Sequence, residues 1–369
     1  MNDRDSLLAA VLEHPEEDTP RLMYADWLQE NGDPDRGQFV RLQVEGAHAE
    51  PYSPQARECE TAAQHLLERH RGTWTRHLLK RAIGWQFVRG FVEHVALDAA
   101  TFGRDAAALF AAEPVRSVQV VRFALTVAHA PLNSLFDAPQ LTRVTRLDFS
   151  KLGHGVDYFE PLAGCPQLGA LTDLNFRSTP VPVQWLRAFL AGPALPALRA
   201  LDLADIPNLS RVLSESLPRA DHRRFTKLDL SYIPFKSDEV QKALASRCVR
   251  WVEELRLGWR PQTGPGPLSY LDLGFTFPWE RLRLLDLEGQ QVGDNGVREI
   301  VAELGRRRTT PPLRWLGLAR NGLRADAVHT LVNADPRVKL YHLDLRENGL
   351  TSGQRAALQD RFPEAEILV

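Results

Sequence analysis

The chain of 369 residues contains little of what would place it in several large classes of protein. Its three cysteines, Cys59, Cys165 and Cys248, are far apart and form no CxxC pair, so we expect reduced thiols and no disulfide framework. No run approaches the ~20 consecutive apolar residues that a membrane span requires, and the polar start Met-Asn-Asp-Arg-Asp is unlike a signal peptide. The formal net charge is −2, whereas nucleic-acid binders are commonly strongly basic. We therefore expect a cytoplasmic protein that binds neither membranes nor nucleic acid.

The common signatures of catalytic and cofactor sites are also missing. The sequence has no GxSxG, HExxH or phosphate-binding loop. Gly264 and Gly266 alternate with prolines, which cannot offer the N–H groups that cradle a phosphate. His65 and His70 would lie about 140° apart around a helix, which excludes the shared face of a metal-binding pair. We expect a protein that is not an enzyme, with no cofactor and no metal.

What the chain does contain is a repeated six-residue phrase: apolar, two free positions, apolar, one free position, apolar. It occurs nine times between Val144 and Leu345, and all 27 key positions are apolar, against 44% of the whole chain. Five successive copies are spaced by 27 residues, a period that predicts a leucine-rich repeat horseshoe with one short parallel strand in each repeat. The copies begin at Val144, Leu171, Leu198, Phe225, Val252, Leu268, Leu282, Leu313 and Leu340.

The segments between the phrases predict helical returns, so the repeats resemble the ribonuclease-inhibitor type of horseshoe. The leucines at the fourth phrase position are expected in the core: Leu147, Leu174, Leu201, Leu228, Leu255, Leu285, Leu316 and Leu343. Helices are expected at 182–191, 208–216, 237–246, 294–306, 324–334 and 352–362, and a closing strand at 367–369.

Two irregularities interrupt this pattern. The copy at Leu268 lies only 16 residues after its predecessor and 14 before its successor, too short for full repeats of about 20–29 residues. The stretch 264–267 alternates Gly and Pro, so we expect tight loops without a helix there, together with a change of curvature. The asparagine that usually follows the strand appears only at Asn321 and Asn348, while Thr179, Ile206, Ile233 and Gln290 occupy that place elsewhere.

The N-terminal quarter differs from the repeats and carries a resemblance. The segments 18–28 (DTPRLMYADWL), 32–34 (GDP), 37–43 (GQFVRLQ) and 88–95 (VRGFVEHV) resemble the bacterial repeat-companion domain of planctomycetes and myxobacteria, over about residues 1–97. The resemblance implies a small all-α domain beside leucine-rich repeats and carries no catalytic activity. We expect a helical companion domain at 1–87 that covers the end of an α/β solenoid at 88–369. Within the solenoid, residues 88–143 would form irregular first turns, and 144–369 the regular repeats and a C-terminal cap.

Side chains at phrase positions three, five and seven should face the concave side of the sheet. Position five is aspartate in six copies: Asp148, Asp202, Asp229, Asp272, Asp286 and Asp344. These carboxylates repel one another unless neighbours offset them, and we assign that role to Arg146 and Lys227 at position three and Arg177 and Arg346 at position seven. Leu-Asp-Leu is also a common strand filler, so both interpretations stay open. An acidic stripe would favour a basic or arginine-bearing protein partner.

Large rings gather at position three in the C-terminal copies. Trp315 has no place in the core, because Leu313, Leu316 and Leu318 already take the inward positions. Exposed aromatic side chains are typical of binding hot spots. The candidate partner-binding residues on the concave face are Tyr270, Asp272, Asp286, Trp315, Tyr341, His342, Asp344 and Arg346.

These observations favour a non-enzymatic recognition module or scaffold that binds a protein through the concave face of its repeats. Bacterial signalling or defence assemblies are a setting implied by analogy with such repeats beside a small domain. The alternative is a substrate-recruiting or regulatory subunit of a separately encoded enzyme, such as a protease or a protein-modifying enzyme. The oligomeric state and the identity of the partner are left open.

Overall fold

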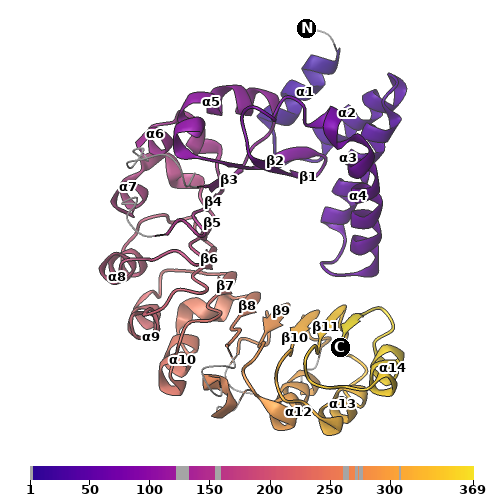
Figure 1. Cartoon of the computed structure of the whole chain (residues 1–369), viewed down its shortest axis with the longest axis vertical. Helices are drawn as coiled ribbons and strands as arrows, with labels where there is room; N and C mark the ends of the chain where they lie inside the picture. Colours follow the sequence, from indigo (N-terminus) through magenta and orange to yellow (C-terminus); the bar gives the residue numbers. More distant parts are fainter. Residues whose placement is uncertain are drawn as a thin grey trace. The chain divides into compact units, whose positions relative to one another are not determined.

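The structure is a computed structural model that describes residues 3–121, 133–153, 159–260, 266–270, 273, 277–306 and 309–369. The chain divides into two compact units, Met1–Leu171 and Thr172–Val369 (Figure 1). Among the described residues, no helix combines the length and apolar character needed to cross a membrane.

The first unit begins with four helices, in the region where a helical domain was expected. Proline occupies the first turn of the last three, where its missing N–H costs nothing. The fourth helix ends at Trp74, where the Thr75 hydroxyl donates to the Arg71 carbonyl at 2.7 Å. The helices are α1 (Asp3–Glu13), α2 (Thr19–Glu30), α3 (Pro34–His48) and α4 (Pro54–Trp74).

A four-stranded sheet follows in the same unit, in the order β1-β2-β3-β4. Strands β1 (Gly84–Val88) and β2 (Phe91–Leu97) form an antiparallel hairpin, whereas β3 (Ser117–Val120) and β4 (Arg146–Asp148) add in parallel. Residues 1–87 are therefore not entirely helical, since β1 begins at Gly84. The remaining elements are α5 (Ala99–Ala112), α6 (Asn133–Phe136), α7 (Phe159–Gly164) and the 3₁₀ turns η1 (Pro139–Arg143) and η2 (Pro166–Ala170).

The turn of the β1–β2 hairpin is held by arginines and a glutamine of the helices. Arg21 is fully buried and donates to the Glu93 carboxylate at 2.8 Å and to the Arg89 carbonyl at 3.1 Å. Gly90 donates its N–H to Gln43 at 2.8 Å and accepts from Arg36 at 2.5 Å. Three of the segments that carried the family resemblance, 18–28, 37–43 and 88–95, thus meet at this turn.

An apolar cluster completes the contact between the helices and the hairpin. Its buried members are Val11, Tyr24, Ala25, Leu28, Val40, Val44 and Phe91. The Tyr24 and Phe91 ring centroids lie 5.6 Å apart, and those of Phe39 and Phe87 lie 5.2 Å apart. The helices therefore pack against Phe91 of β2.

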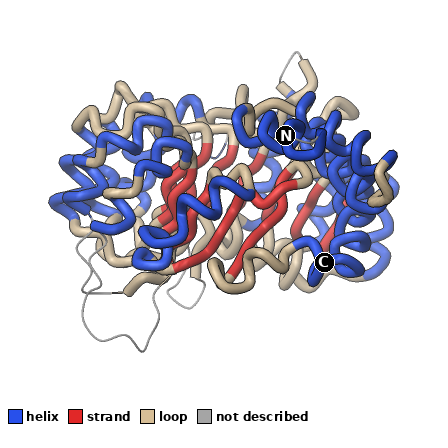
Figure 2. The backbone as a smooth tube through the Cα atoms, turned by 90° about the horizontal axis from the view of Figure 1, so that it is seen from above, coloured by secondary structure: helices blue, strands red, loops and turns tan. Residues whose placement is uncertain are grey.

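The second unit is a ladder of eight short parallel strands in chain order (Figures 1 and 2). The register pairs the fourth-position leucines with one another along the unit, from Leu174 to Leu343, and Ile367 ends the row. All eight predicted core leucines, Leu147 of the first unit included, are at most 2% exposed. The strands are β5 (Asp173–Asn175), β6 (Ala200–Asp202), β7 (Lys227–Asp229), β8 (Glu254–Arg256), β9 (Leu284–Asp286), β10 (Trp315–Gly317), β11 (His342–Asp344) and β12 (Glu366–Leu368).

Helical returns connect these strands close to the expected positions. Helix α14, for example, begins with a capping box in which Thr351 and Gln354 exchange hydrogen bonds. Parallel strands, helical returns and a repeating leucine core define an α/β solenoid of leucine-rich repeats, as predicted. The helices are α8 (Val183–Ala191), α9 (Ser210–Ser216), α10 (Ser237–Leu244), α12 (Gly293–Gly305), α13 (Ala325–Val332) and α14 (Ser352–Arg361), with 3₁₀ turns η3 (Leu217–Arg219) and η4 (Arg247–Trp251).

The irregular copy at Leu268 does not form a repeat. Strand β8 pairs directly with β9, and Leu268 lies in a short 3₁₀ turn, η6 (Pro267–Tyr270), which begins at the last residue of the 264–267 stretch. Residues 264 and 265 lie outside the described residues, and Gly266 is not helical. Leu268 and Leu273 are nonetheless 1% exposed, which explains their apolar character. The apolar phrase here reflects burial in a long return.

In the turn after each strand, a residue with positive φ recurs at the same repeat position, which the residue types do not predict. At phrase position eight, Ser178, Asp205, Tyr232, Gly289, Arg320 and Glu347 have φ between +55° and +71°. The side-chain amides of Asn321 and Asn348 donate to the Leu287 and Leu318 carbonyls of the preceding repeat, at 2.9 and 2.8 Å. Gln290 does the same to the Leu257 carbonyl at 2.5 Å, so it substitutes for the missing asparagine.

Gly90 provides a test of the hairpin attachment. Its φ is +88°, and an added Cβ would lie 2.6 Å from Cγ2 of Val40 and 2.8 Å from its Cα. Gly32 has a similar φ of +96° with nothing within 4 Å, so Gly32→Ala measures backbone strain alone, about 1–2 kcal/mol. We expect Gly90→Ala to lower the free energy of unfolding by roughly a further 1–3 kcal/mol in denaturant titrations. Equal losses in the two variants would contradict the proposed tight contact.

Candidate functional site

The strand face of the second unit, defined as the residues at phrase positions three, five and seven, holds the candidate site. Alternation along each strand turns these side chains away from the leucine core. The face is not uniformly open: Leu284, at position three of β9, is 0% exposed, and Asp344 is 6% exposed. Side chains on this face therefore pack against one another.

The aspartates of position five have a structural use. In each, Oδ1 accepts the backbone N–H two residues later, at position seven, with distances between 2.8 and 3.1 Å. Such a bond closes the chain into a turn directly after the strand. Asn175 makes the same bond to Arg177. The strand-filler interpretation of Leu-Asp-Leu is thus supported for these residues: Asp148, Asp202, Asp229, Asp286 and Asp344.

Arginines take up much of the remaining negative charge, in part as expected. Arg177 forms ion pairs with Asp202 at 3.1 Å and with Asp229, across two successive strands. Arg346 donates to both oxygens of Asp344, at 2.9 and 2.6 Å. Lys227 does not pair with this row and instead contacts Glu254 at 2.7 Å, because both occupy position three of paired strands. That predicted offset was wrong.

Asp286 has a more distant cationic partner than Asp202, Asp229 or Asp344. Its Oδ2 lies 3.5 Å from Arg256, at the limit of a hydrogen bond. Burial raises the pKa of Asp286 to about 6, and burial together with the neighbouring Asp229 raises the pKa of Asp202 to about 6. Burial acts on Asp344 in the same direction, but hydrogen bonds from Arg346 outweigh it and lower the pKa of Asp344. Equivalent repeat positions therefore have opposite electrostatic character.

Trp315, His342 and Arg256 form an aromatic stack on the same face. The Trp315 and His342 rings lie 4.9 Å apart and within 7° of parallel, and the Arg256 guanidinium carbon lies 5.4 Å from the Trp315 ring centroid. His342 Nδ1 is 3.2 Å from the Glu366 carboxylate. Gly317 makes room for the indole, because an added Cβ would lie 2.6 Å from both Trp315 Cζ3 and Asp286 Oδ1. Trp315 and Asp286 are therefore neighbours around Gly317.

The structure brings together some of the predicted site residues and separates others. Asp286, Trp315 and His342 share the region of the stack, and Asp344, two residues after His342 on β11, forms an ion pair with Arg346. Tyr341 lies at position two, where the Arg314 guanidinium carbon is 5.7 Å from its ring. Asp272 and the side chain of Tyr270 lie outside the described residues.

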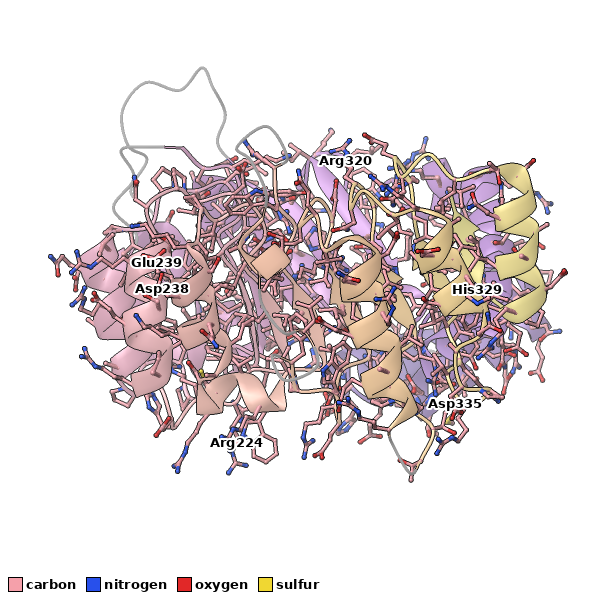
Figure 3. All side chains as sticks on the ribbon, turned by 90° about the horizontal axis from the view of Figure 1, so that it is seen from below. Arg224, Asp238, Glu239, Arg320, His329 and Asp335 are labelled. Atoms are coloured by element: carbon pink, nitrogen blue, oxygen red, sulfur yellow. The ribbon has the colours of Figure 1, made fainter. Side chains whose placement is uncertain are left out.

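Sequence reasoning missed a polar cluster at the C-terminal edge of the strands. The Tyr232 hydroxyl donates to Glu288 at 3.0 Å, and Arg320, which is labelled in Figure 3, bridges Glu288 and Glu347 at 3.2 and 2.5 Å. Burial and the Glu288 charge raise the pKa of Tyr232 to about 12. The sequence did contain a signal for this cluster, because Tyr232, Arg320 and Glu347 all occupy position eight of their repeats.

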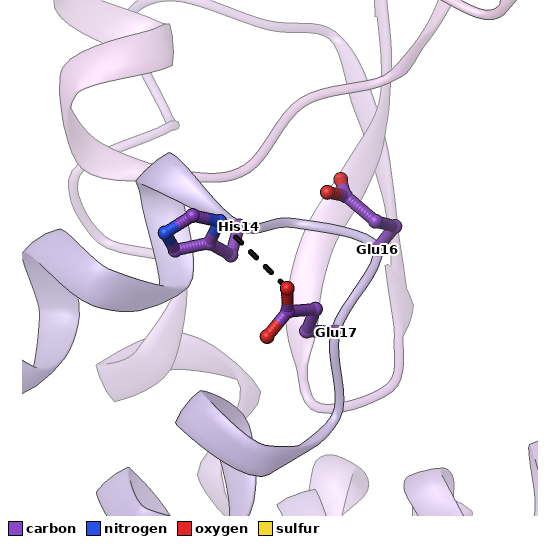
Figure 4. Close-up of side chains that lie close together, drawn as sticks. All are labelled: His14, Glu16 and Glu17. Atoms are coloured by element: carbon purple, nitrogen blue, oxygen red, sulfur yellow. Dashed lines mark ion pairs between the residues drawn. The ribbon is translucent and has the colours of Figure 1, made fainter.

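Two features of the first unit have residue types that are also found in metal or catalytic sites. His14, Glu16 and Glu17 place their ligand atoms within 4.8 Å of one another, but all three are exposed and Glu16 lies 4.0 Å from Arg116 (Figure 4). A hollow of about 490 Å³ between α3, α4 and β1 is lined by Cys59, Glu60 and Arg71, among others. Burial raises the pKa of the Cys59 thiol, which disfavours the thiolate that nucleophilic catalysis requires. Neither feature resembles a catalytic centre.

Comparison with known proteins gives little beyond this. No protein-family model matches the chain, and no curated protein is detectably similar to it in sequence. Among solved structures, a Rad7–Elc1 complex of yeast is similar at 14% identity with a TM-score of 0.41, over 69% of this chain and 75% of that one. A TLR13–ssRNA13 complex is similar at 17% identity with a TM-score of 0.35, over 74% of this chain and 38% of that one.

The opposite pKa shifts of Asp286 and Asp344 predict opposite effects of the same substitution. Between about pH 4 and 6 the folded state keeps a proton on Asp286 that the unfolded chain has lost, so ionisation of this group lowers stability as pH rises through that window. Asp286→Asn keeps the turn acceptor and should raise the free energy of unfolding at pH 7 by about 1–3 kcal/mol, with no gain below pH ~4. Denaturant titrations from pH 4 to 8 measure this.

Asp344→Asn is the matched control. The pKa of Asp344 is lowered, so its ionised form stabilises the fold above the unfolded pKa, and the variant should be less stable at pH 7. The same sign of change in both variants would contradict the assigned environments.

Proposed function

We propose that the chain is a non-enzymatic recognition module that binds a protein partner through the strand face of its second unit. The observation that carries the proposal is the aromatic stack of Trp315, His342 and Arg256 beside the under-satisfied carboxylate of Asp286. Rings held by neighbours lose little conformational freedom on binding, which favours contact residues of this kind. An arginine of the partner suits this place, because its guanidinium could form an ion pair with the Asp286 carboxylate and lie close to the Trp315 indole.

In this proposal, only part of the predicted acidic stripe contacts the partner. Asp202, Asp229 and Asp344 already pair with arginines of the same chain, so they contribute mainly to the shape and rigidity of the face. Asp286 and the exposed Arg346 remain the contacts that a partner would meet first. Tyr270, Asp272 and Tyr341 stay as proposed peripheral contacts.

We further propose a domain type for the N-terminal residues, a capping role for them and a location for the protein. The resemblance at 18–43 and 88–95 supports a repeat-companion domain of bacterial type, and its residues hold the β1–β2 hairpin in the first unit. A role for residues 1–87 as the cover of a solenoid end belongs to the same proposal, as does a cytoplasmic location. A recruiting subunit of a separate enzyme would use the same strand face, and co-purification with an active enzyme would favour it.

The test is a binding titration with a partner captured from source cells and then purified. Trp315→Ala should weaken binding by at least ~2 kcal/mol, because the stack loses its central ring. Trp315→Phe keeps a ring opposite His342, so its affinity should lie between those of the wild type and of Trp315→Ala. This variant distinguishes loss of the contact with the partner from loss of packing within the stack. Trp27→Ala, in α2 of the first unit, is the control and should leave the affinity unchanged. Unchanged affinity in Trp315→Ala would remove the site from the strand face.

The pH dependence of the same titration is a second prediction. Asp286 must be ionised to receive a cation, so affinity should rise with pH through about 6 and level off above pH 7. Asp286→Asn should flatten this profile, whereas Arg355→Gln on the exposed surface of α14 should leave it intact. A profile that is flat in the wild-type protein would rule out Asp286 as a cation contact.

A further inference from the structure

The N-terminal edge of the strands in the second unit carries a row of arginines that the proposed function does not use. Backbone hydrogen bonds join position two of successive repeats: Thr226 N–H to the Arg199 carbonyl, Glu253 to Thr226 and Arg283 to Glu253, all at 2.7 Å. These residues therefore follow one another at the strand spacing of about 4.8 Å. We call the exposed arginines Arg199, Arg224, Arg250, Arg281 and Arg283 the basic edge.

Trp251 lies at the centre of the basic edge and is 37% exposed. Guanidinium carbons of Arg224 and Arg281, from the repeats on either side, lie 4.9 and 4.5 Å from its ring centroid. The ring orients both arginines by cation–π contact, so two guanidinium groups from different repeats are held at the same exposed side chain. This arrangement also explains why a tryptophan stays exposed here.

The positive charge at this edge is largely uncompensated. The segments 197–199, 224–226, 250–253 and 280–284 contain five arginines against two carboxylates, Glu253 and Glu280, in a chain whose net charge is −2. Within the part of the chain that the structure describes, Arg224, Arg250 and Arg281 form no ion pair, whereas the nearby Arg247 lies 3.8 Å from Asp221. Like charges held close together favour an anionic partner, which relieves their repulsion.

We infer that the basic edge is a second interaction surface, which binds an acidic segment of a protein. Arginine forks recognise carboxylates in bidentate geometry, and several at strand spacing suit successive Asp or Glu side chains. Single-stranded nucleic acid is disfavoured, because Arg224 and Arg281 occupy the ring of Trp251, whereas such binders stack bases on free aromatic faces. Glu253 within the row also opposes a continuous run of phosphates.

The basic edge lies at the N-terminal ends of the strands, outside positions three, five and seven, which define the strand face. Arg224 and Arg320 mark opposite ends of the strands of the second unit, and Figure 3 shows them on opposite sides of that unit. Failure of one surface therefore does not entail failure of the other.

The experiment is a fluorescence titration of the full chain with a labelled oligo-glutamate peptide at low and high salt. The double variant Arg224→Gln/Arg281→Gln should weaken binding at least about tenfold at low salt. Arg283→Gln, which makes no contact with Trp251, should also weaken it and excludes an effect of altered tryptophan packing. Arg355→Gln removes the same charge from an exposed site on α14 and should leave binding unchanged.

Two outcomes would overturn the inference. One is a wild-type protein that does not bind the peptide at low salt, or that binds it equally well in all the variants. The other is tighter binding of a labelled single-stranded oligonucleotide, with the same losses in the variants, which would assign the edge to nucleic acid.

Discussion

The in-register parallel pairing of short strands, each with one buried leucine, is the constraint on which the rest of the second unit depends. Leu201, Leu228 and Leu255 pair directly along the ladder and are at most 2% exposed. Once this row is aligned, equivalent positions of neighbouring repeats lie about 4.8 Å apart. The Trp315–His342 stack, the Arg177 bridge and the Arg224–Trp251–Arg281 contact all follow from that alignment, since each joins residues of neighbouring repeats.

The strand face shows how one residue type serves several purposes at equivalent positions. Each described position-five aspartate uses one oxygen to close the turn, so the aspartate is required whether or not a partner exists. The surroundings of the other oxygen, Oδ2, differ between repeats. Arg346 donates to Oδ2 of Asp344 at 2.6 Å, whereas Arg256 lies 3.5 Å from Oδ2 of Asp286. A binding contact therefore arises where the internal pairing is incomplete, and not wherever an acid occurs.

Much of the fold could be predicted because apolar periodicity reports burial directly. The core leucines, the helical returns and the closing strand β12 follow from spacing alone. The same signal failed at Leu268, where apolar residues are buried in a return without forming a strand, since burial and strand pairing produce the same pattern. The positive φ values of Tyr232 and Arg320 were also hidden, because no glycine marks those positions.

The candidate site was less accessible to sequence reasoning. Position three placed Trp315 and His342 on the strand face, where both are half-buried and not fully exposed as expected. Their stacking depends on Gly317 and on Arg256, which reaches across β9. The pairing of Lys227 with Glu254 and not with the aspartates depends on side-chain reach, which spacing does not encode. Charge counted over the whole chain also concealed the basic edge, because local excesses cancel in a net charge of −2.

Site-specific photo-crosslinking in the cells that produce the protein tests the central claim most directly. A photoreactive residue would be introduced at Arg346, which is 59% exposed on the strand face, and separately at Arg355 on the outer helix α14. The account predicts a discrete cross-linked protein partner from position 346 and none from position 355. Cross-links from position 355 alone, or from both positions equally, would contradict recognition through the strand face.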